Sequence, residues 1–287
     1  MHTPLSQADI EAFFVAACDA ELGALKPGNV HRFSPGHGMD VSFFERAASA
    51  AGPHIADANL TIGQRIWKAT EASVAATGVN TNLGIVLLAA PLAKAAAETN
   101  VGTGLRRRLA VILSQLSIAD AHDAFAAIRL ANPAGLGHVD RGDIRQQPGP
   151  EMTLIQAMHI AADRDRIARA YVTAYEDVFD FALPRYTQAL AAASSPDLAI
   201  TTLHMTLLAE YPDSHIARKF GLEKAHDVCD QARALSRLWA PVAVPKSRLG
   251  LLNFDADLKS RALNPGTTAD LVVATLFASL ISGRKQP

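Results

Sequence analysis

Apolar residues recur at spacings of three and four along most of this chain, which is the periodicity of helices with one buried face. In the first such segment Ile10, Phe14 and Ala17 share a face. The helix starts at Ser6 and ends before Gly28. Further helices are predicted from Asp40 or Ser42, over 60–76, over 81–98 with a kink at Pro91, and within 102–130.

The second half of the chain follows the same period. Helices are predicted over 153–162, 165–193, 196–210, 214–220 and 222–239, and from Thr267 or Thr268 to 282. Ser42 with Glu45, and Thr267 with Asp270, have the spacing of capping boxes at two of the helix starts. No strand and no internal repeat is visible in the sequence. The pattern predicts an all-α fold of about a dozen helices.

Two segments rich in Gly and Pro interrupt the helical pattern, at 27–40 and at 132–150. The second segment also carries Asp140 and Arg141, and it could be either a domain linker or a loop over a site. We favour a single compact domain over 1–287. In that domain, we expect the polar residues at the helix ends to meet in one central cleft.

Composition narrows the class of protein further. Of 287 residues, 49% are apolar and 19% charged, which excludes a disordered chain. The net charge of -1 gives no basic excess to hold nucleic acid. Two cysteines, Cys18 and Cys229, make no disulfide framework. The most apolar run, 83–97, is too short to span a membrane, and Met1–Phe14 is not a signal peptide. We therefore expect a soluble, cytoplasmic protein.

The first polar cluster joins Glu21 to 26–31 and 36–40. Glu21 continues the apolar face of its helix, and a buried carboxylate is costly without a partner. It is therefore a candidate general base or metal ligand, and Asp40 closes the same loop as a second acid. The alternative is an ion pair between Glu21 and Lys26 or an arginine.

The second cluster, 78–84, opens an alanine-rich helix. Free backbone N–H groups and the helix dipole favour an anion there. Asn80, Thr81 and Asn82 add short side-chain donors, and Gly84 would let a ligand come close. Simple helix capping is the alternative. No phosphate-loop or dinucleotide fingerprint is present.

The third cluster places Asp120 and Asp123 on the apolar stripe of one helix. Paired carboxylates suit Mg²⁺, whereas pairing with Arg129 or another basic residue is the structural alternative. His122 points elsewhere.

The fourth cluster is 211–221, in which Asp213 or Ser214 caps a short helix. Arg218 and Lys219 follow and could hold phosphates. A solvated surface turn is the alternative.

Taken together, these clusters resemble the triphosphoribosyl-dephospho-CoA synthase family over nearly the whole chain. The residues that carry the resemblance are Glu21, 26–30, His37, Met39, Asp40, 80–84, Asp120, Ala121, 127–129, 135–137, Asp213, Arg218, Gly221, 263–266 and 269–271. Their order and spacing together are more specific than any one of them.

The resemblance implies an all-α transferase that joins the ribose of ATP to the 2′-hydroxyl of dephospho-CoA and expels adenine. It implies Mg²⁺ as the cofactor and catalytic roles for Glu21 and Asp40. The nucleotide-binding residues would be Lys26, Gly28, Asn29, His37, Asn80, Thr81, Asn82, Gly84, Arg218 and Lys219. The metal ligands would be Asp120, Asp123 and Asp213.

Residues 213–219 resemble an archaeal and methylotroph branch of the family, which is linked to one-carbon carriers of the methanopterin or methanofuran type. This departure leaves the acceptor open, and 132–150 is the expected specificity loop. The alternative functions are a kinase or other ATP-dependent step in making such a coenzyme, and a helical protein that binds a nucleotide without turnover. The expected partners are ATP and a coenzyme-like acceptor, with no nucleic acid and no membrane. A homodimer is left open.

Overall fold

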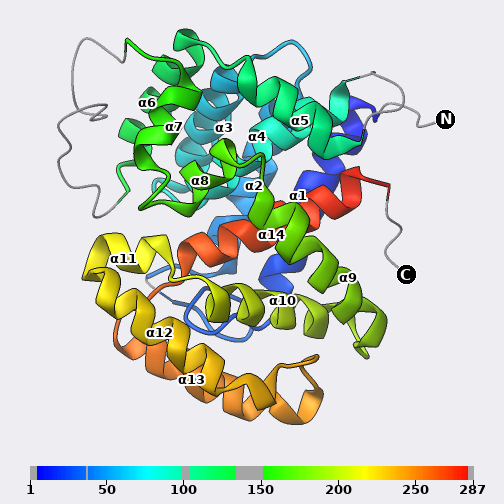
Figure 1. Cartoon of the computed structure of the whole chain (residues 1–287), viewed down its shortest axis with the longest axis vertical. Coiled ribbons are helices and arrows are strands. Elements are labelled where there is room, and N and C mark those ends of the chain that lie inside the picture. The colour runs from blue at the N-terminus through cyan, green and yellow to red at the C-terminus, as the bar shows by residue number, and fades with distance from the viewer. Residues whose placement is uncertain (1–4, 37, 99–103, 134–150, 284–287) are drawn as a thin grey trace.

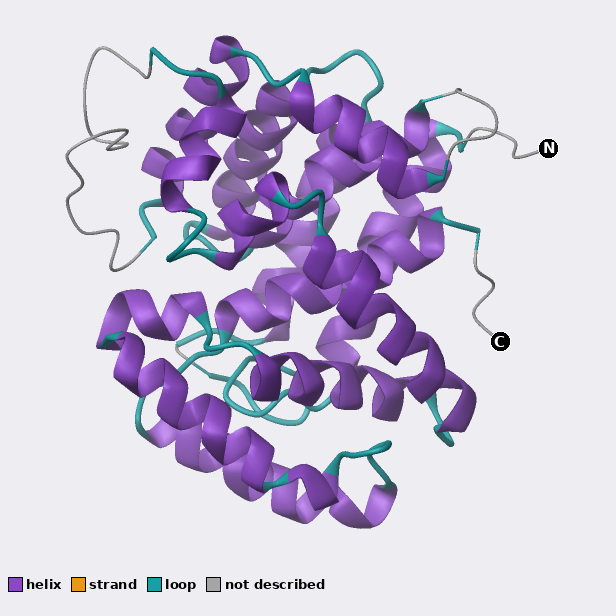
Figure 2. Ribbon diagram, viewed as in Figure 1, coloured by secondary structure: helices purple, strands orange, loops and turns teal. Residues whose placement is uncertain are grey.

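The computed structural model describes residues 5–36, 38–98, 104–133 and 151–283. Within these ranges Figure 2 shows helices joined by loops and no strand. The only β contacts of the described residues are two isolated bridges, His31–Ser34 and Gly36–Met39. The α-helices are α1 (Gln7–Gly23), α2 (Val41–Ala56), α3 (Ile62–Thr77), α4 (Leu83–Ala97), α5 (Leu105–Ser114), α6 (Ile118–Ala131), α7 (Leu154–Ala161), α8 (Arg166–Val172), α9 (Leu183–Ala192), α10 (Pro196–Glu210), α11 (Ser214–Phe220), α12 (Leu222–Ala234), α13 (Arg248–Ser260) and α14 (Gly266–Ile281). The predicted all-α class is confirmed.

Helices α4 and α14 form the centre of the molecule. Nearly every residue of both helices is buried, because both are apolar on all sides and rich in Ala, Val and Leu. They pack on each other, and α14 also packs on α1 and α10. Figure 1 shows α14 crossing the middle of the molecule, with α3–α8 on one side and α10–α13 on the other.

Two hydrophobic clusters meet at α10. Ile200, Leu203 and Leu207 belong to the larger cluster, which contains α4 and α14. Met205 and Leu208 lie on the opposite side of α10 and pack with α12 and α13. Since α10 is buried on both sides, it fixes the outer pair of helices relative to the centre.

A proline inside α4 is supported by a tyrosine from α8. Pro91 has no N–H group, so the carbonyl of Leu87 loses its helical partner. The Tyr171 hydroxyl donates to that carbonyl at 2.6 Å. Tyr175 donates to the next carbonyl, Leu88, at 3.0 Å. These bonds satisfy buried oxygens and tie the two segments together.

The structure differs from the predicted elements in three places. The helix predicted over 165–193 is interrupted after α8, where Ala174 and Tyr175 have positive φ, and it continues as the π-helical turn Asp177–Ala182 before α9. Helix α13 was not predicted, because Gly250 and the acids within it weaken the apolar period. The cap of α2 is Asp40 and not Ser42.

No single helix among the described residues is long and apolar enough to cross a membrane. Helices α5 and α6 meet that test only when they are taken together across a bend of 98°. Both cysteines are buried and free.

Candidate active site

A cleft of about 1200 Å³ lies where four helix ends meet. Its walls are formed by the start of α4, the segment around α8, the first turn of α11 and the first turn of α14. Glu21 of α1 and Asn29 of the following loop also face it. The cleft therefore brings together residues from both ends of the sequence.

The start of α4 presents unpartnered donors. Asn82 is the N-cap of this helix, yet its side chain makes no capping hydrogen bond. Asn80 instead accepts from the N–H group of Leu83 at 3.2 Å. Thr81 Oγ1 and Asn82 Nδ2 are buried and have no hydrogen-bond partner among the described residues. Buried polar groups are usually paired, so this helix end is suited to an acceptor supplied by a ligand.

Gly84 makes room for a carboxylate from α14. A Cβ atom at position 84 would overlap Asp270 Oδ2 and come within 2.9 Å of Ile167 Cδ1. The space left by the missing side chain is thus filled by Asp270. The sequence predicted that a ligand approaches Gly84. Asp270 takes up the space where a side chain would lie, and Gly84 itself lines the cleft.

Asp270 is an acid of the cleft with a strongly perturbed pKa. Burial raises its pKa well above the ordinary value, and the nearby negative charges of Asp213 and Glu21 add to the effect. Arg218 opposes it. Asp270 has no hydrogen bond or ion pair with the described residues. The capping box predicted for Thr267 and Asp270 is therefore wrong, as α14 has no side-chain cap.

Glu21 belongs to a buried chain of polar contacts behind and beside the cleft. Lys26 is fully buried and donates to Glu21 Oε1, to Asn29 Oδ1 at 3.0 Å and to the carbonyl of Val30 at 2.8 Å. Asn29 donates to Asn264 at 2.8 Å, just before α14. Burial raises the pKa of Glu21, and the adjacent Lys26 ammonium opposes the rise. The ion pair foreseen as the structural alternative is present, and Glu21 also faces the cleft.

Four arginines line the cleft: Arg164, Arg166, Arg169 and Arg218. The Arg166 guanidinium stacks on the Tyr211 ring at 3.7 Å, and Arg218 contacts Asp165 at 3.2 Å. The Nε atoms of Arg166 and Arg169 are buried and lack a hydrogen-bond partner within the described part of the chain. This set of donors suits a multiply charged anion.

Another part of the wall is apolar. Phe125 and Ile128 of α6 and Met158 of α7 line it, and Leu130 and Ile160 stand at 40% and 37% exposure. Such a wall lowers the local dielectric and strengthens the electrostatic contacts beside it.

Six of the predicted site residues line the cleft, and they are Glu21, Asn29, Asn80, Thr81, Gly84 and Arg218. Three more lie directly behind the lining: Lys26, Gly28 and Asn82. Lys219 does not line the cleft; its side chain is exposed beside the Phe220 ring. His37 lies outside the described residues. Residues 134–150, which include Asp140 and Arg141, also lie outside them, although the preceding Asn132 and Pro133 line the cleft.

The structure does not place Asp40 in the cleft. Asp40 is the exposed N-cap of α2 and accepts from the N–H group of Ser42 at 2.8 Å. Hydrogen bonds from Ser42 lower its pKa, which makes it a poor base. The structure gives Asp40 a capping role, and its catalytic role stays a prediction.

Asp120 and Asp123 lie at the contact of α3 with α6 and do not line the cleft. Asp120 closes a capping box with Ser117 and accepts from the N–H group of Gly63 at 2.7 Å. A Cβ atom on Gly63 would lie 2.5 Å from Asp120 Cα, so the two backbones touch. The structure gives Asp120 a role in helix capping and packing, and the metal role of Asp120 and Asp123 stays a prediction.

Asp213 also accepts hydrogen bonds that hold two helix starts together. Its Oδ1 accepts from the N–H groups of His215 and Ile216, and its Oδ2 accepts from the N–H and hydroxyl groups of Thr268. These four bonds join the starts of α11 and α14 and occupy the oxygens that a metal would need. Among the described residues no group of three or more His, Cys, Asp or Glu could hold a metal ion. The metal role of Asp213 stays a prediction.

Several cleft residues escaped the sequence analysis. Asp165, Arg166 and Arg169 line the cleft. They lie in a run of alternating charges, which is typical of a solvent-exposed helix face and therefore gave no sign of a site. Asn264 and Asp270 were predicted only as parts of the segments that carry the family resemblance, and Asp270 also as part of a capping box. The available signal was their position beside glycines and prolines in the segments that carried the family resemblance.

Comparison of the sequence with known proteins identifies the family of this chain. The model of the CitG family, described as ATP:dephospho-CoA triphosphoribosyl transferase, matches residues 7–287. A protein of Pectobacterium carotovorum named "Probable 2-(5''-triphosphoribosyl)-3'-dephosphocoenzyme-A synthase" is 28% identical over 270 residues, covering 87% of this chain and 81% of that protein. A Pectobacterium atrosepticum synthase of the same kind is 32% identical over 101 residues, 35% of this chain and 32% of its own length.

Among solved structures, an Archaeoglobus fulgidus protein described as a triphosphoribosyl-dephospho-CoA synthase has the same fold. The TM-score is 0.64 at 22% sequence identity, and the match covers 83% of this chain and 99% of that chain.

Proposed function

This chain belongs to the ATP:dephospho-CoA triphosphoribosyl transferase family, and we propose that it transfers the triphosphoribosyl group of ATP to a hydroxyl group of dephospho-CoA with release of adenine. The cleft at the starts of α4 and α14 is the site of the reaction. It combines the two features that the reaction needs, namely donors for a triphosphate and carboxylates for the transfer.

The observation that carries the proposal is a set of buried donors without acceptors around one cleft. They are Thr81 Oγ1, Asn82 Nδ2, Arg166 Nε and Arg169 Nε. An unpaired buried donor costs about 1–3 kcal/mol, so several of them beside one cleft favour a ligand rich in acceptors. A triphosphate supplies such acceptors, and the positive end of the α4 dipole attracts it.

Mg²⁺ fits this site as a companion of the triphosphate. Mg²⁺ is usually held by one or two carboxylates, substrate phosphates and water. Glu21, Asp163, Asp165 and Asp270 are the carboxylates that line the cleft, and one or two of them would hold the ion. The oxygens of Asp120 and Asp213 accept hydrogen bonds from Gly63 and Thr268 instead. Bound there, the ion would neutralise phosphate charge.

The transfer itself breaks the bond between ribose C1′ and the adenine nitrogen and forms a bond from C1′ to the acceptor oxygen. The acceptor proton must leave, and the leaving adenine takes up a proton. Asp270, with its raised pKa and no hydrogen-bond partner among the described residues, is placed to accept the hydroxyl proton. Carboxylate charge at Glu21 and Asp270 also favours the positive charge that develops at C1′.

Product analysis tests the proposal. The purified protein is incubated with ATP, Mg²⁺ and dephospho-CoA, and the products are identified by mass spectrometry. We expect adenine and a triphosphoribosyl adduct of dephospho-CoA in equal amounts. Production of ADP would instead identify a kinase, and ATP binding without either product would identify a nucleotide-binding protein. Adenine release only with a one-carbon coenzyme precursor would keep the transfer and change the acceptor.

A further inference from the structure

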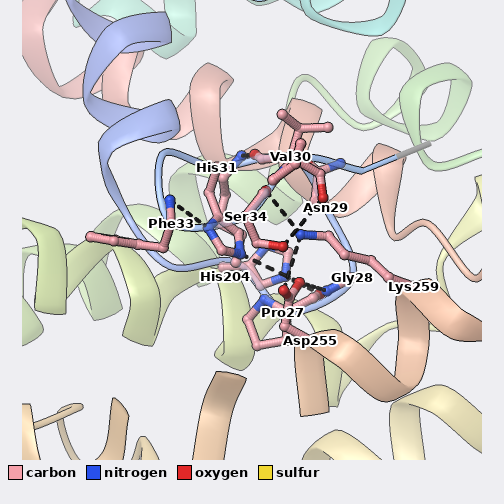
Figure 3. A network of polar contacts seen from close by, with 12 residues as sticks. Pro27, Gly28, Asn29, Val30, His31, Phe33, Ser34, His204, Asp255 and Lys259 are labelled. Carbon is pink, nitrogen blue, oxygen red and sulfur yellow. Dashed lines mark hydrogen bonds and ion pairs between the residues drawn. The ribbon is translucent and has the colours of Figure 1, made fainter. Parts of the chain in front are cut away.

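Asp255 and Lys259 of helix α13 contact the loop that carries Asn29 (Figure 3). No residue of α13 lines the cleft. Asp255 Oδ1 accepts from the N–H group of Gly28 at 2.9 Å, and Oδ2 accepts from Lys259 Nζ at 3.0 Å. Lys259 also donates to the carbonyl of Ser34 at 3.1 Å. Two backbone groups of the loop are thus fixed by one pair of side chains. Asp255 is 2% exposed, so water does not compete for it.

The loop fits closely between α13 and the start of α14. Gly28 has a φ of +86°, which favours glycine. A Cβ atom there would lie 2.7 Å from Pro265 Cδ and 2.9 Å from Leu258 Cδ1. The next residue, Asn29, is hydrogen bonded to Asn264 on the cleft side. A shift of the Gly28 backbone would therefore move two residues of the cleft wall.

The two lysines beside this loop each form an ion pair with a carboxylate. Lys26 pairs with Glu21, and Lys259 pairs with Asp255. His31 accepts from the N–H group of Phe33 through Nδ1 at 3.2 Å, so its proton is on Nε2, which lies 3.3 Å from Asp255 Oδ1.

Both histidines beside these pairs are held neutral. Burial lowers the pKa of His31, and the Lys259 and Lys26 charges lower it further, although Asp255 opposes them. Burial also lowers the pKa of His204 to about 3. Removing the Asp255 charge would leave the Lys259 ammonium without its partner in a buried cluster, and such imbalance is costly.

We propose that Asp255 and Lys259 are positioning residues for the transfer reaction. They hold the loop from Lys26 to Ser34 through the Gly28 N–H group and the Ser34 carbonyl, and they thereby fix Glu21 and Asn29 in the cleft. Neither side chain touches the substrate. The catalytic consequence rests on the proposed function, whereas the hold on the loop does not.

Asp255→Asn tests this role, since the amide oxygen can still accept from Gly28 but the charge opposite Lys259 is lost. We expect kcat to fall by about tenfold to a hundredfold, because small misplacements of reacting groups have such effects. The KM for ATP should stay within about threefold, since the α4 start and the arginines are unchanged. Hydrogen exchange followed by mass spectrometry should become faster in peptides covering 24–36. The matched control is Asp257→Asn on the exposed side of α13, which should change none of these.

A second pair of variants keeps the test decisive if Asp255→Asn does not fold. Lys259→Met should reproduce the fall in kcat and the faster exchange, and Lys259→Arg should restore most of both. Wild-type kcat and wild-type exchange in the folded variants would overturn the proposal. If the wild-type protein releases no adenine, the proposed function fails, and the exchange of 24–36 still decides whether α13 holds the loop.

Discussion

Gly84 and Asp270 are in direct contact, and the Asp270 carboxylate fits only because position 84 has no side chain. The absent side chain at 84 is filled by the Asp270 carboxylate, and burial among other acids raises the pKa of that group. The sequence marks both positions but cannot pair them, because only the fold brings the starts of α4 and α14 together. A carboxylate in so unfavourable a place is typical of a functional site.

Gly84→Ala should displace this carboxylate. In a helix the change would ordinarily stabilise by about 1 kcal/mol, but here the overlap should reverse the sign and cost about 1–3 kcal/mol. We expect kcat for adenine release to fall by at least about tenfold. Gly104→Ala is the control, since a Cβ atom there meets nothing within 4 Å. Equal kcat values for the two variants would show that the position of Asp270 is unimportant.

Asp270→Asn should raise thermal stability at neutral pH. Between the ordinary carboxyl pKa of 3.8 and its raised folded value, the folded state binds more protons than the unfolded chain. The free energy of unfolding therefore falls as the pH rises through this window, and the penalty is complete above it. Asn has no such penalty. We expect Tm to rise by about 2 °C or more at pH 7.5, with a gain that shrinks towards pH 4, as measured by calorimetry. A lower Tm at every pH would contradict this account.

At the scale of elements, the helical period of the sequence predicted most of the helices. The roles of their polar residues depend on which residues of other helices lie beside them. Asp120 lies on the apolar stripe of α6 as predicted, but its partner is the N–H group of Gly63 on α3. Helix α13 was missed, and with it Asp255. The sequence pattern predicts which face of a helix is buried, but it does not predict which other helix packs against that face.

Asp120→Ala separates the capping role from a metal role. Loss of the cap and of the bond to Gly63 should lower the free energy of unfolding by about 1–2 kcal/mol. Chemical denaturation measures this change. The concentration of Mg²⁺ that gives half-maximal activity should stay the same. A clear shift in that concentration would return Asp120 to the metal site.

Arg169→Gln tests the contribution of α8 to nucleotide binding. Loss of hydrogen bonds to a charged group costs about 1.5–3 kcal/mol, so the Kd for ATP should rise by at least about tenfold in isothermal titration. Arg107→Gln on the exposed face of α5 is the control and should bind ATP like the wild type. Identical affinities for both variants would remove α8 from the triphosphate site.

At the scale of the whole molecule, the sequence predicted the fold class and the family, and the family model confirms membership over 7–287. The sequence also predicted that the four polar clusters meet in one cleft. In the structure, residues of the first, second and fourth clusters line one cleft. The Asp120 cluster lies instead between α3 and α6. The difference arises because short polar residues serve equally well as helix caps and as ligands, and sequence spacing does not distinguish these uses.

The central claim is that ATP loses adenine in this cleft with help from Asp270. The most direct test is the rate of adenine release from ATP with dephospho-CoA, compared between the wild type, Asp270→Asn and the control Asp257→Asn. We predict adenine release by the wild type and the control, and a fall of about 10²-fold or more in Asp270→Asn, as expected for loss of a general base. Adenine release by Asp270→Asn at the wild-type rate, or ADP in place of adenine from the wild type, would contradict it.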